Sequence, residues 1–284
     1  MTYYDNLDKK RYNELAECFE YFDPHSLDRL QIAHSDRVST DILSYYSKRE
    51  FLDDNDISFN SLITGTKNLF DEVGLCRVSG AAKSILSSTR FGKGLSIYDF
   101  DFTVMSDIAF DGRSYYKVPN IVILPEYYTL SSIHFLAHEV CHIIKEINPR
   151  ECMNVYTLEE VIPITIELIT AFEKGRFDVF KKRELLIKDT ADLYLKLTKD
   201  KDFITEEDMF GFMSCYRKSI MYLNSFYYAM KLFSRYLEDK EDTLEFIEMV
   251  LVGESNTKRL VDILFTEDDC SYDIGLSEFR SKLK

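Results

Sequence analysis

Long apolar runs, a basic N-terminal leader and an excess of positive charge are all missing from this sequence. No stretch approaches the roughly eighteen apolar residues of a membrane span, so we expect no transmembrane helix. Residues 1–5 show no basic region followed by an apolar run, so we expect no signal peptide. The formal net charge of −14 disfavours nucleic-acid backbones and anionic membranes as partners. We therefore expect a cytoplasmic protein that binds neither nucleic acid nor membranes.

Cysteine and tryptophan usage set two further limits. The 6 cysteines are scattered, without a C-x-x-C pair, which is typical of reduced thiols rather than of a disulfide framework. Tryptophan is absent, whereas 19 tyrosines and 21 phenylalanines supply the large apolar side chains. Aromatic residues at this density usually fill a helical core, and some of them could line a peptide cleft. A chain of 284 residues can bury a full core as one domain or as two lobes.

Hydrophobic spacing divides the chain into helical parts on either side of a short sheet. Residues 1–90 carry apolar positions at helical spacing and predict an N-terminal helical lobe. Residues 91–284 are predicted to form a second, catalytic domain. It would begin with a small sheet at 95–124, continue with the metal-binding helices at 130–173 and end with helices at 176–284. The predicted fold is therefore mostly α.

Two segments before residue 125 predict strands. Tyr98–Phe102 alternates aromatic and acidic residues with a period of two, and Val118–Leu124 is an apolar, β-branched run that ends at Pro125. The edge of such a sheet offers main-chain hydrogen bonds to an extended substrate. The alternative is a sheet that only covers the core, and the sequence leaves both interpretations open.

The H-E-x-x-H motif at residues 138–142 is the strongest functional signal. On a helix, His138 and His142 lie four residues apart on one face, where both imidazoles can reach the same cation. Glu139 lies about 100° around the helix, where it can act as a general base without being a ligand. Zinc held by two histidines, a carboxylate and a water is the usual catalytic arrangement for this motif. The alternative is an exposed helix that carries two histidines by chance.

A third protein ligand is expected on a later helix. The candidates among the following acids are Glu159, Glu160, Glu167 and Glu173. We favour Glu160 as the metal ligand. Glu167, seven residues on and on the same face, is expected to orient His138 or His142 by accepting a hydrogen bond from it. Glu159 is the fallback ligand. In the alternative interpretation, Thr157 and Glu160 form a capping box, in which Glu160 only satisfies a backbone N–H. Pro163 is expected to loosen this turn of the helix.

Three segments resemble the thimet oligopeptidase and oligoendopeptidase F family of zinc metallopeptidases, which are H-E-x-x-H gluzincins. Val118–Leu124 with Phe135–Glu139 is similar to the family's strand and its entry to the metal helix. Glu160–Glu167 resembles its third-ligand helix, and Tyr222–Ala229 resembles its tyrosine-bearing segment. The resemblance covers about residues 115–275. It implies a zincin-like, mostly helical catalytic domain with a small sheet beside the metal helix, zinc as cofactor and short peptides as substrates.

The resemblance also implies that a tyrosine hydroxyl hydrogen-bonds the oxyanion that develops during peptide hydrolysis. Tyr222 is the first choice for this donor and Tyr228 the second; core packing is the alternative for either side chain. Four differences from the family accompany the likeness. Cys141 replaces a glycine, no histidine follows His142, the spacing from His142 to Glu160 is shorter, and the chain is about half the usual length.

The function predicted from these residues is zinc-dependent hydrolysis of peptide bonds in short peptides, with Glu139 as general base acting on a zinc-activated water. One alternative is a non-catalytic module that binds a peptide or a partner on a peptidase scaffold. Another is a protease that cuts one specific protein target. The sequence makes no prediction of the oligomeric state.

Overall fold

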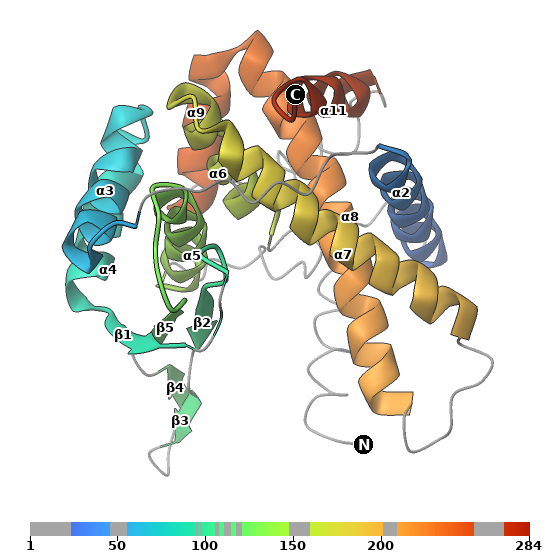
Figure 1. The fold of residues 1–284 in the computed structure, drawn as a ribbon, viewed down its shortest axis with the longest axis horizontal. Coiled ribbons are helices and arrows are strands. Elements are labelled where there is room, and N and C mark those ends of the chain that lie inside the picture. Colours follow the sequence, from blue (N-terminus) through green and yellow to red (C-terminus); the bar gives the residue numbers. More distant parts are fainter. Residues whose placement is uncertain are drawn as a thin grey trace.

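The structure is a computed structural model, shown in Figure 1, and most of its described chain is helical. It describes residues 24–45, 56–94, 96, 98–105, 108–110, 115–117, 121–147, 160–200, 209–252 and 270–284. Within these residues the prediction of a mostly helical fold with a small sheet is confirmed. No helix in the described ranges is long and apolar enough to cross a membrane.

The helices fall before and after a short β region. They are α2 (Pro24–Ser44), α3 (Phe59–Glu72), α4 (Cys76–Ser88), α5 (Ser132–Ile147), α6 (Val161–Glu173), α7 (Phe177–Asp200), α8 (Met209–Glu238), α9 (Lys240–Leu251) and α11 (Cys270–Ser281). The H-E-x-x-H motif lies in α5, as the sequence predicts. Glu167 lies in the middle of α6, and Tyr222 and Tyr228 lie in α8.

The strands form two small sheets, one of which precedes α5. They are β1 (Arg90–Lys93), β2 (Thr103–Met105), β3 (Ile108–Phe110), β4 (Tyr115–Lys117) and β5 (Ile121–Leu124). In the larger sheet β5 is central, pairing parallel with β1 and antiparallel with β2; β3 and β4 pair antiparallel. Within the predicted strand Val118–Leu124, residues 118–120 lie outside the described part of the chain.

The alternating segment Tyr98–Phe102 is a turn, so the prediction of a strand there is wrong. A backbone hydrogen bond of 3.1 Å closes the turn, and the strand begins only at Thr103. The physical reason is Asp99, which points into the protein instead of outward. Its carboxylate accepts hydrogen bonds from Lys182 and from Ser131 at the start of the α5 region. The segment therefore anchors this region to α7 instead of pairing in a sheet.

Helix α6 is surrounded by other helices, because its sequence is apolar on all sides. Every residue of 161–171 is buried, and the helix packs against α5, α7 and α8 (Figure 1). A helix that is apolar all round needs such a central position. Glu167 is a carboxylate with no exposed surface in this setting, so it requires charged or hydrogen-bonding partners.

The N-terminal helices share the core with α5, which carries the H-E-x-x-H motif. Both α3 and α4 pack against α5, while α2 packs against α7 and α8. Their buried residues belong to the same hydrophobic cluster as those of α5 and α6. The division of the chain into domains at residue 90 stays a prediction.

Candidate metal centre

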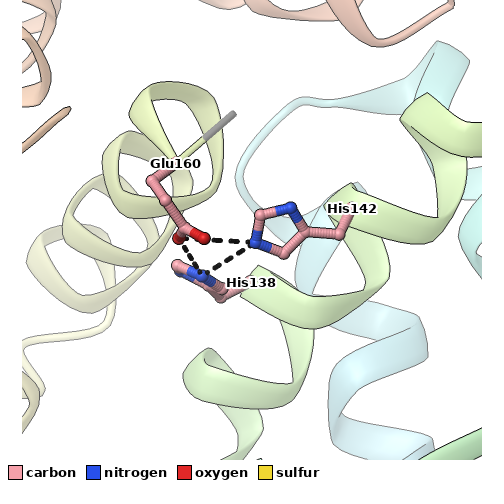
Figure 2. Close-up of side chains that lie close together, drawn as sticks. All are labelled: His138, His142 and Glu160. Atoms are coloured by element: carbon pink, nitrogen blue, oxygen red, sulfur yellow. Dashed lines mark hydrogen bonds and ion pairs between the residues drawn. The ribbon is translucent and has the colours of Figure 1, made fainter. Parts of the chain in front are cut away.

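Helix α5 presents the two motif histidines on one face. Leu136, Val140 and Ile143 turn the opposite side of the helix into the core. His138 and His142 then lie one turn apart and point toward each other (Figure 2). Their Nε2 atoms are 3.2 Å apart. Two imidazoles that aim the same nitrogen at one point are arranged for a shared cation.

Glu160 closes the group from the start of α6. Its Oε2 atom lies 3.1 Å from Nε2 of His138 and 3.4 Å from Nε2 of His142 (Figure 2). The predicted alternative of a capping box is wrong for this side chain. Glu160 is itself the N-cap residue of α6 and makes no side-chain capping bond. Thr157 and the fallback ligand Glu159 lie outside the described residues.

Pro163 leaves the start of α6 regular instead of loosening it. It is the third residue of the helix, where a backbone N–H has no partner within the helix in any case. Glu160 accepts a backbone hydrogen bond of 3.0 Å from Ile164, so the first turn is closed. The Glu160 carboxylate is thus held at a well-formed helix end.

The three donor atoms fit a metal ion. They form a triangle with sides of 3.1, 3.2 and 3.4 Å. Ligands about 2.1 Å from a tetrahedral zinc ion lie about 3.4 Å from one another, so the triangle matches one face of such a complex. Three protein ligands leave a fourth position open, as in catalytic zinc sites. The group could therefore bind a metal ion, and its geometry alone does not select which metal.

The electrostatics of this group favour positive charge. Burial by itself would lower the pKa of His138, but the hydrogen bonds with Glu160 and Glu167 outweigh burial and raise that pKa to about 9. For Glu160, burial favours the neutral acid, yet the charges and hydrogen bonds of His142 and His138 hold its pKa well below the usual value. The position between these side chains stabilises a proton or another cation.

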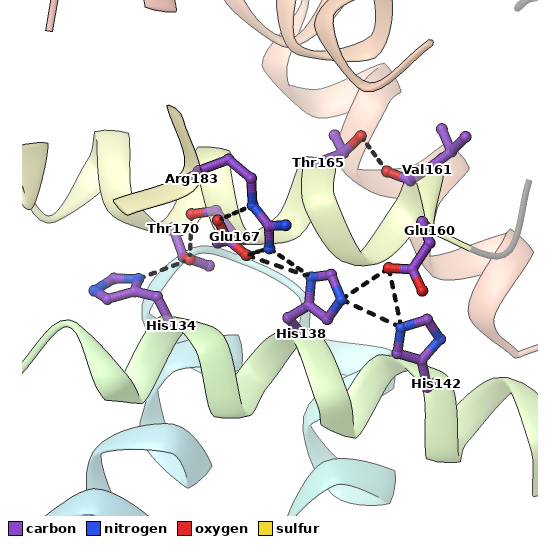
Figure 3. A network of polar contacts seen from close by, with 9 residues as sticks. All are labelled: His134, His138, His142, Glu160, Val161, Thr165, Glu167, Thr170 and Arg183. Carbon is purple, nitrogen blue, oxygen red and sulfur yellow. Dashed lines mark hydrogen bonds and ion pairs between the residues drawn. The ribbon is translucent and has the colours of Figure 1, made fainter. Parts of the chain in front are cut away.

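Glu167 and Arg183 form a buried ion pair behind His138, as Figure 3 shows. Glu167 Oε2 lies 3.3 Å from Nδ1 of His138, so the residue predicted to orient a ligand histidine contacts one of the ligand candidates. Arg183 Nε donates to Oε1 of the same carboxylate at 2.8 Å, and Arg183 Nη2 donates to Oε2. Burial would raise the pKa of Glu167, but the charge of Arg183 outweighs it and lowers that pKa. Sequence reasoning missed Arg183, because one arginine in the amphipathic helix α7 carries no signal.

Glu139 adjoins the metal-ligand candidates but is not one of them. Its side chain is half-buried. Burial raises the pKa of Glu139, and the charges of His138 and His142 oppose that rise. A carboxyl group with a raised pKa exchanges protons closer to neutral pH, which suits a general base that must also return the proton.

The two predicted tyrosines occupy different environments. Burial, with the charge of Glu160, raises the pKa of Tyr222, and its hydroxyl lies within hydrogen-bonding reach of the Glu160 carboxylate. Tyr228 is buried in the core, with its ring edge-on to Tyr227 and to His34 of α2. These contacts favour core packing for Tyr228, and its role as an oxyanion donor stays a prediction.

Two further residues of α5 pack beside the site. His134 is buried one turn before His138, and its Nδ1 lies 2.9 Å from the hydroxyl of Thr170 (Figure 3). Burial lowers the pKa of His134 to about 4, so it is neutral at physiological pH. Cys141 is fully buried, and burial raises the pKa of its thiol, so it packs as a neutral side chain. Neither residue belongs to the group of possible ligands.

Comparisons with known proteins add little to this geometry. No family model matches the chain, and no curated protein is similar to it. Among solved structures, the chain is similar to the crystal structure of a "putative peptidase" from Chlamydophila abortus, with 12% sequence identity and a TM-score of 0.48. The match covers 97% of this chain but 55% of that one, so the chain spans about half of its neighbour's length. At this similarity the neighbour assigns neither a family nor an activity, and membership in the oligoendopeptidase F family stays a prediction.

Proposed function

We propose that this protein is a zinc-dependent peptidase of the zincin type that hydrolyses short peptides. One observation carries the proposal. Two histidine nitrogens from α5 and a carboxylate oxygen from α6 form a triangle of metal-ligand dimensions, with Glu139 next to it. An exposed helix with two chance histidines would not have this third group. Zinc is the metal that this donor set and the H-E-x-x-H motif favour.

Each residue of the proposed site has a separate role. His138, His142 and Glu160 would hold the ion. A bound zinc ion supplies Lewis acidity that polarises a peptide carbonyl and makes a water molecule more acidic. Glu139 accepts a proton from the attacking water and passes it to the leaving amine. Tyr222 donates a hydrogen bond from its hydroxyl to the developing oxyanion.

The sheet before α5 supports an extended peptide as substrate. In the larger described sheet β2 is an edge strand, and it contacts α5. An extended segment that pairs with β2 would run past the helix that carries the H-E-x-x-H motif. The proposed partner is thus a peptide in the cytoplasm, and neither nucleic acid nor membrane is part of the proposal.

The test compares metal content and hydrolysis in one pair of variants. Purified protein is analysed for metals, and cleavage is measured with a library of quenched fluorescent peptides. Glu139→Gln should retain zinc and lose turnover, because the amide cannot accept the proton. Glu238→Gln removes an exposed carboxylate at the end of α8 and should cleave normally.

Two outcomes would contradict the proposal. Turnover by Glu139→Gln equal to wild type would refute its role as base. Bound zinc without cleavage of any peptide would favour the alternative, a non-catalytic binding module. The absence of a histidine after His142 is the sequence feature that favours this alternative.

A further inference from the structure

We propose that Arg183 is a positioning residue of the metal centre, holding Glu167 so that His138 presents Nε2 to the ion. This inference rests on the proposed function, since it assumes that the site binds a metal. Arg183 belongs to α7 and is not one of the three ligand candidates. The hydrogen bonds of Arg183 lead to the site through Glu167 and His138.

Arg183 fixes the orientation of the Glu167 carboxylate. Its Nε donates to Oε1 at 2.8 Å, and its Nη2 donates to Oε2, so both oxygens are bound by one planar group. A two-point contact of this kind restricts rotation of the carboxylate as well as its distance. The side chain of Arg183 is 4% exposed and that of Glu167 is 0% exposed, so water does not compete for these bonds.

The orientation of Glu167 decides which nitrogen of His138 carries the proton. Oε2 of Glu167 lies 3.3 Å from Nδ1, and an ionised carboxylate can only accept. Arg183 Nη2 is 3.4 Å from the same nitrogen, but a guanidinium has no acceptor atom, so the partner of an Nδ1–H must be Glu167. In the neutral imidazole that binds a metal ion, Nδ1 then donates to Glu167 and Nε2 keeps its lone pair, on the side of the ring that faces His142 and Glu160.

A neighbouring ion pair provides the matched comparison. Lys182 also lies on α7, and it binds the buried carboxylate of Asp99 and the hydroxyl of Ser131. This pair attaches α7 to the segment before α5, without a described contact to His138. Lys182 and Arg183 thus both join α7 to the α5 region, but only the Arg183 pair continues to a ligand candidate.

The experiment measures zinc affinity by competition with a chelating dye at one fixed pH. Arg183→Met should weaken zinc binding by about 10- to 100-fold, the usual effect of losing a partner of a metal-binding histidine. Arg183→Lys should recover part of that loss, because an ammonium donates to the carboxylate without fixing its plane. Lys182→Met removes the comparison pair and should bind zinc as wild type does.

A spectroscopic measurement separates positioning from general destabilisation. In zinc-loaded protein with ¹⁵N-labelled histidine, the Nδ1–H of His138 should give a low-field proton signal that exchanges slowly. Arg183→Met should shift or lose this signal, whereas Lys182→Met should retain it. Circular dichroism checks whether Arg183→Met folds. If it does not, Arg183→Lys is the test variant, and weaker zinc binding with an altered Nδ1–H signal supports the positioning role of Arg183.

The outcomes distinguish this inference from the proposed function. Wild-type protein that binds no zinc would overturn both. Wild-type zinc affinity in every folded Arg183 variant would overturn the inference and leave the proposed function standing. An equal loss of affinity in Lys182→Met would also overturn it, because the effect would then belong to the packing of α7 and not to His138.

Discussion

Removing the proposed zinc ion should lower the Tm of this protein by several degrees. The three ligand candidates come from two helices, with His138 and His142 on α5 and Glu160 at the start of α6. Glu160 is distant from the histidines along the chain and meets them only when α6 packs against α5. An ion that binds all three groups therefore binds the folded state and not the unfolded chain.

The size of the effect follows from this linkage. Zinc at about 1,000 times its dissociation constant adds about 4 kcal/mol to the free energy of unfolding. The chain has 284 residues, and at about 2.1 cal/mol/K per residue its entropy of unfolding is about 600 cal/mol/K. Dividing the free energy by this entropy gives a rise in Tm of about 7 °C.

The assay is differential scanning calorimetry of chelator-treated protein, with and without added zinc, magnesium or calcium. His142→Ala removes one ligand and should lose the zinc-dependent shift. His134→Asn changes another histidine of the same helix, whose partner is Thr170, and should keep the shift even if its own Tm is lower. The reasoning is refuted if wild type shows no shift with zinc, or if His142→Ala shows the wild-type shift.

Two further predictions concern α8 and α5. Tyr222→Phe should lower kcat by about 100- to 1,000-fold with little change in zinc content, as expected for loss of an oxyanion donor. Tyr228→Phe should leave kcat unchanged. Steady-state measurements of peptide cleavage check both variants. His134 is neutral in the folded protein down to about pH 4, whereas its unfolded pKa is 6.5, so the unfolded state binds more protons and stability falls as pH drops. Between pH 7 and pH 4, the free energy of unfolding of wild type, measured with urea, should fall by about 3 kcal/mol more than that of His134→Gln.

The candidate ligands could be predicted because helical spacing is a local property. His138 and His142 are four residues apart, and the structure brings their Nε2 atoms within 3.2 Å. Glu160 and Glu167 are seven residues apart and lie toward the same neighbour, so both contact His138. Charged residues on an otherwise apolar helix require partners, and that requirement is visible in the amino-acid sequence around these two acids.

Long-range partners could not be predicted in the same way. Arg183 follows Glu167 by sixteen positions on another helix, and only the packing of α7 against α6 brings the two together. The strand predicted at Tyr98–Phe102 was wrong for a related reason. Its alternation resembles that of a strand, but Asp99 is drawn inward by Lys182, an interaction that local periodicity does not contain.

The charges around His138 explain why a cation belongs in this part of the fold. Glu139, Glu160 and Glu167 contribute three carboxyl groups beside His138, and Arg183 contributes one guanidinium, so the acidic side chains outnumber the arginine that faces them. Unbalanced charge is costly in a buried site, and one divalent ion cancels it. Without the ion, protons take its place. Burial raises the pKa of Glu139, and the hydrogen bonds with Glu160 and Glu167 outweigh burial and raise the pKa of His138. Because Arg183 already neutralises Glu167, the remaining demand for positive charge falls on the side of His138 that faces Glu160 and His142, where the three donor atoms converge.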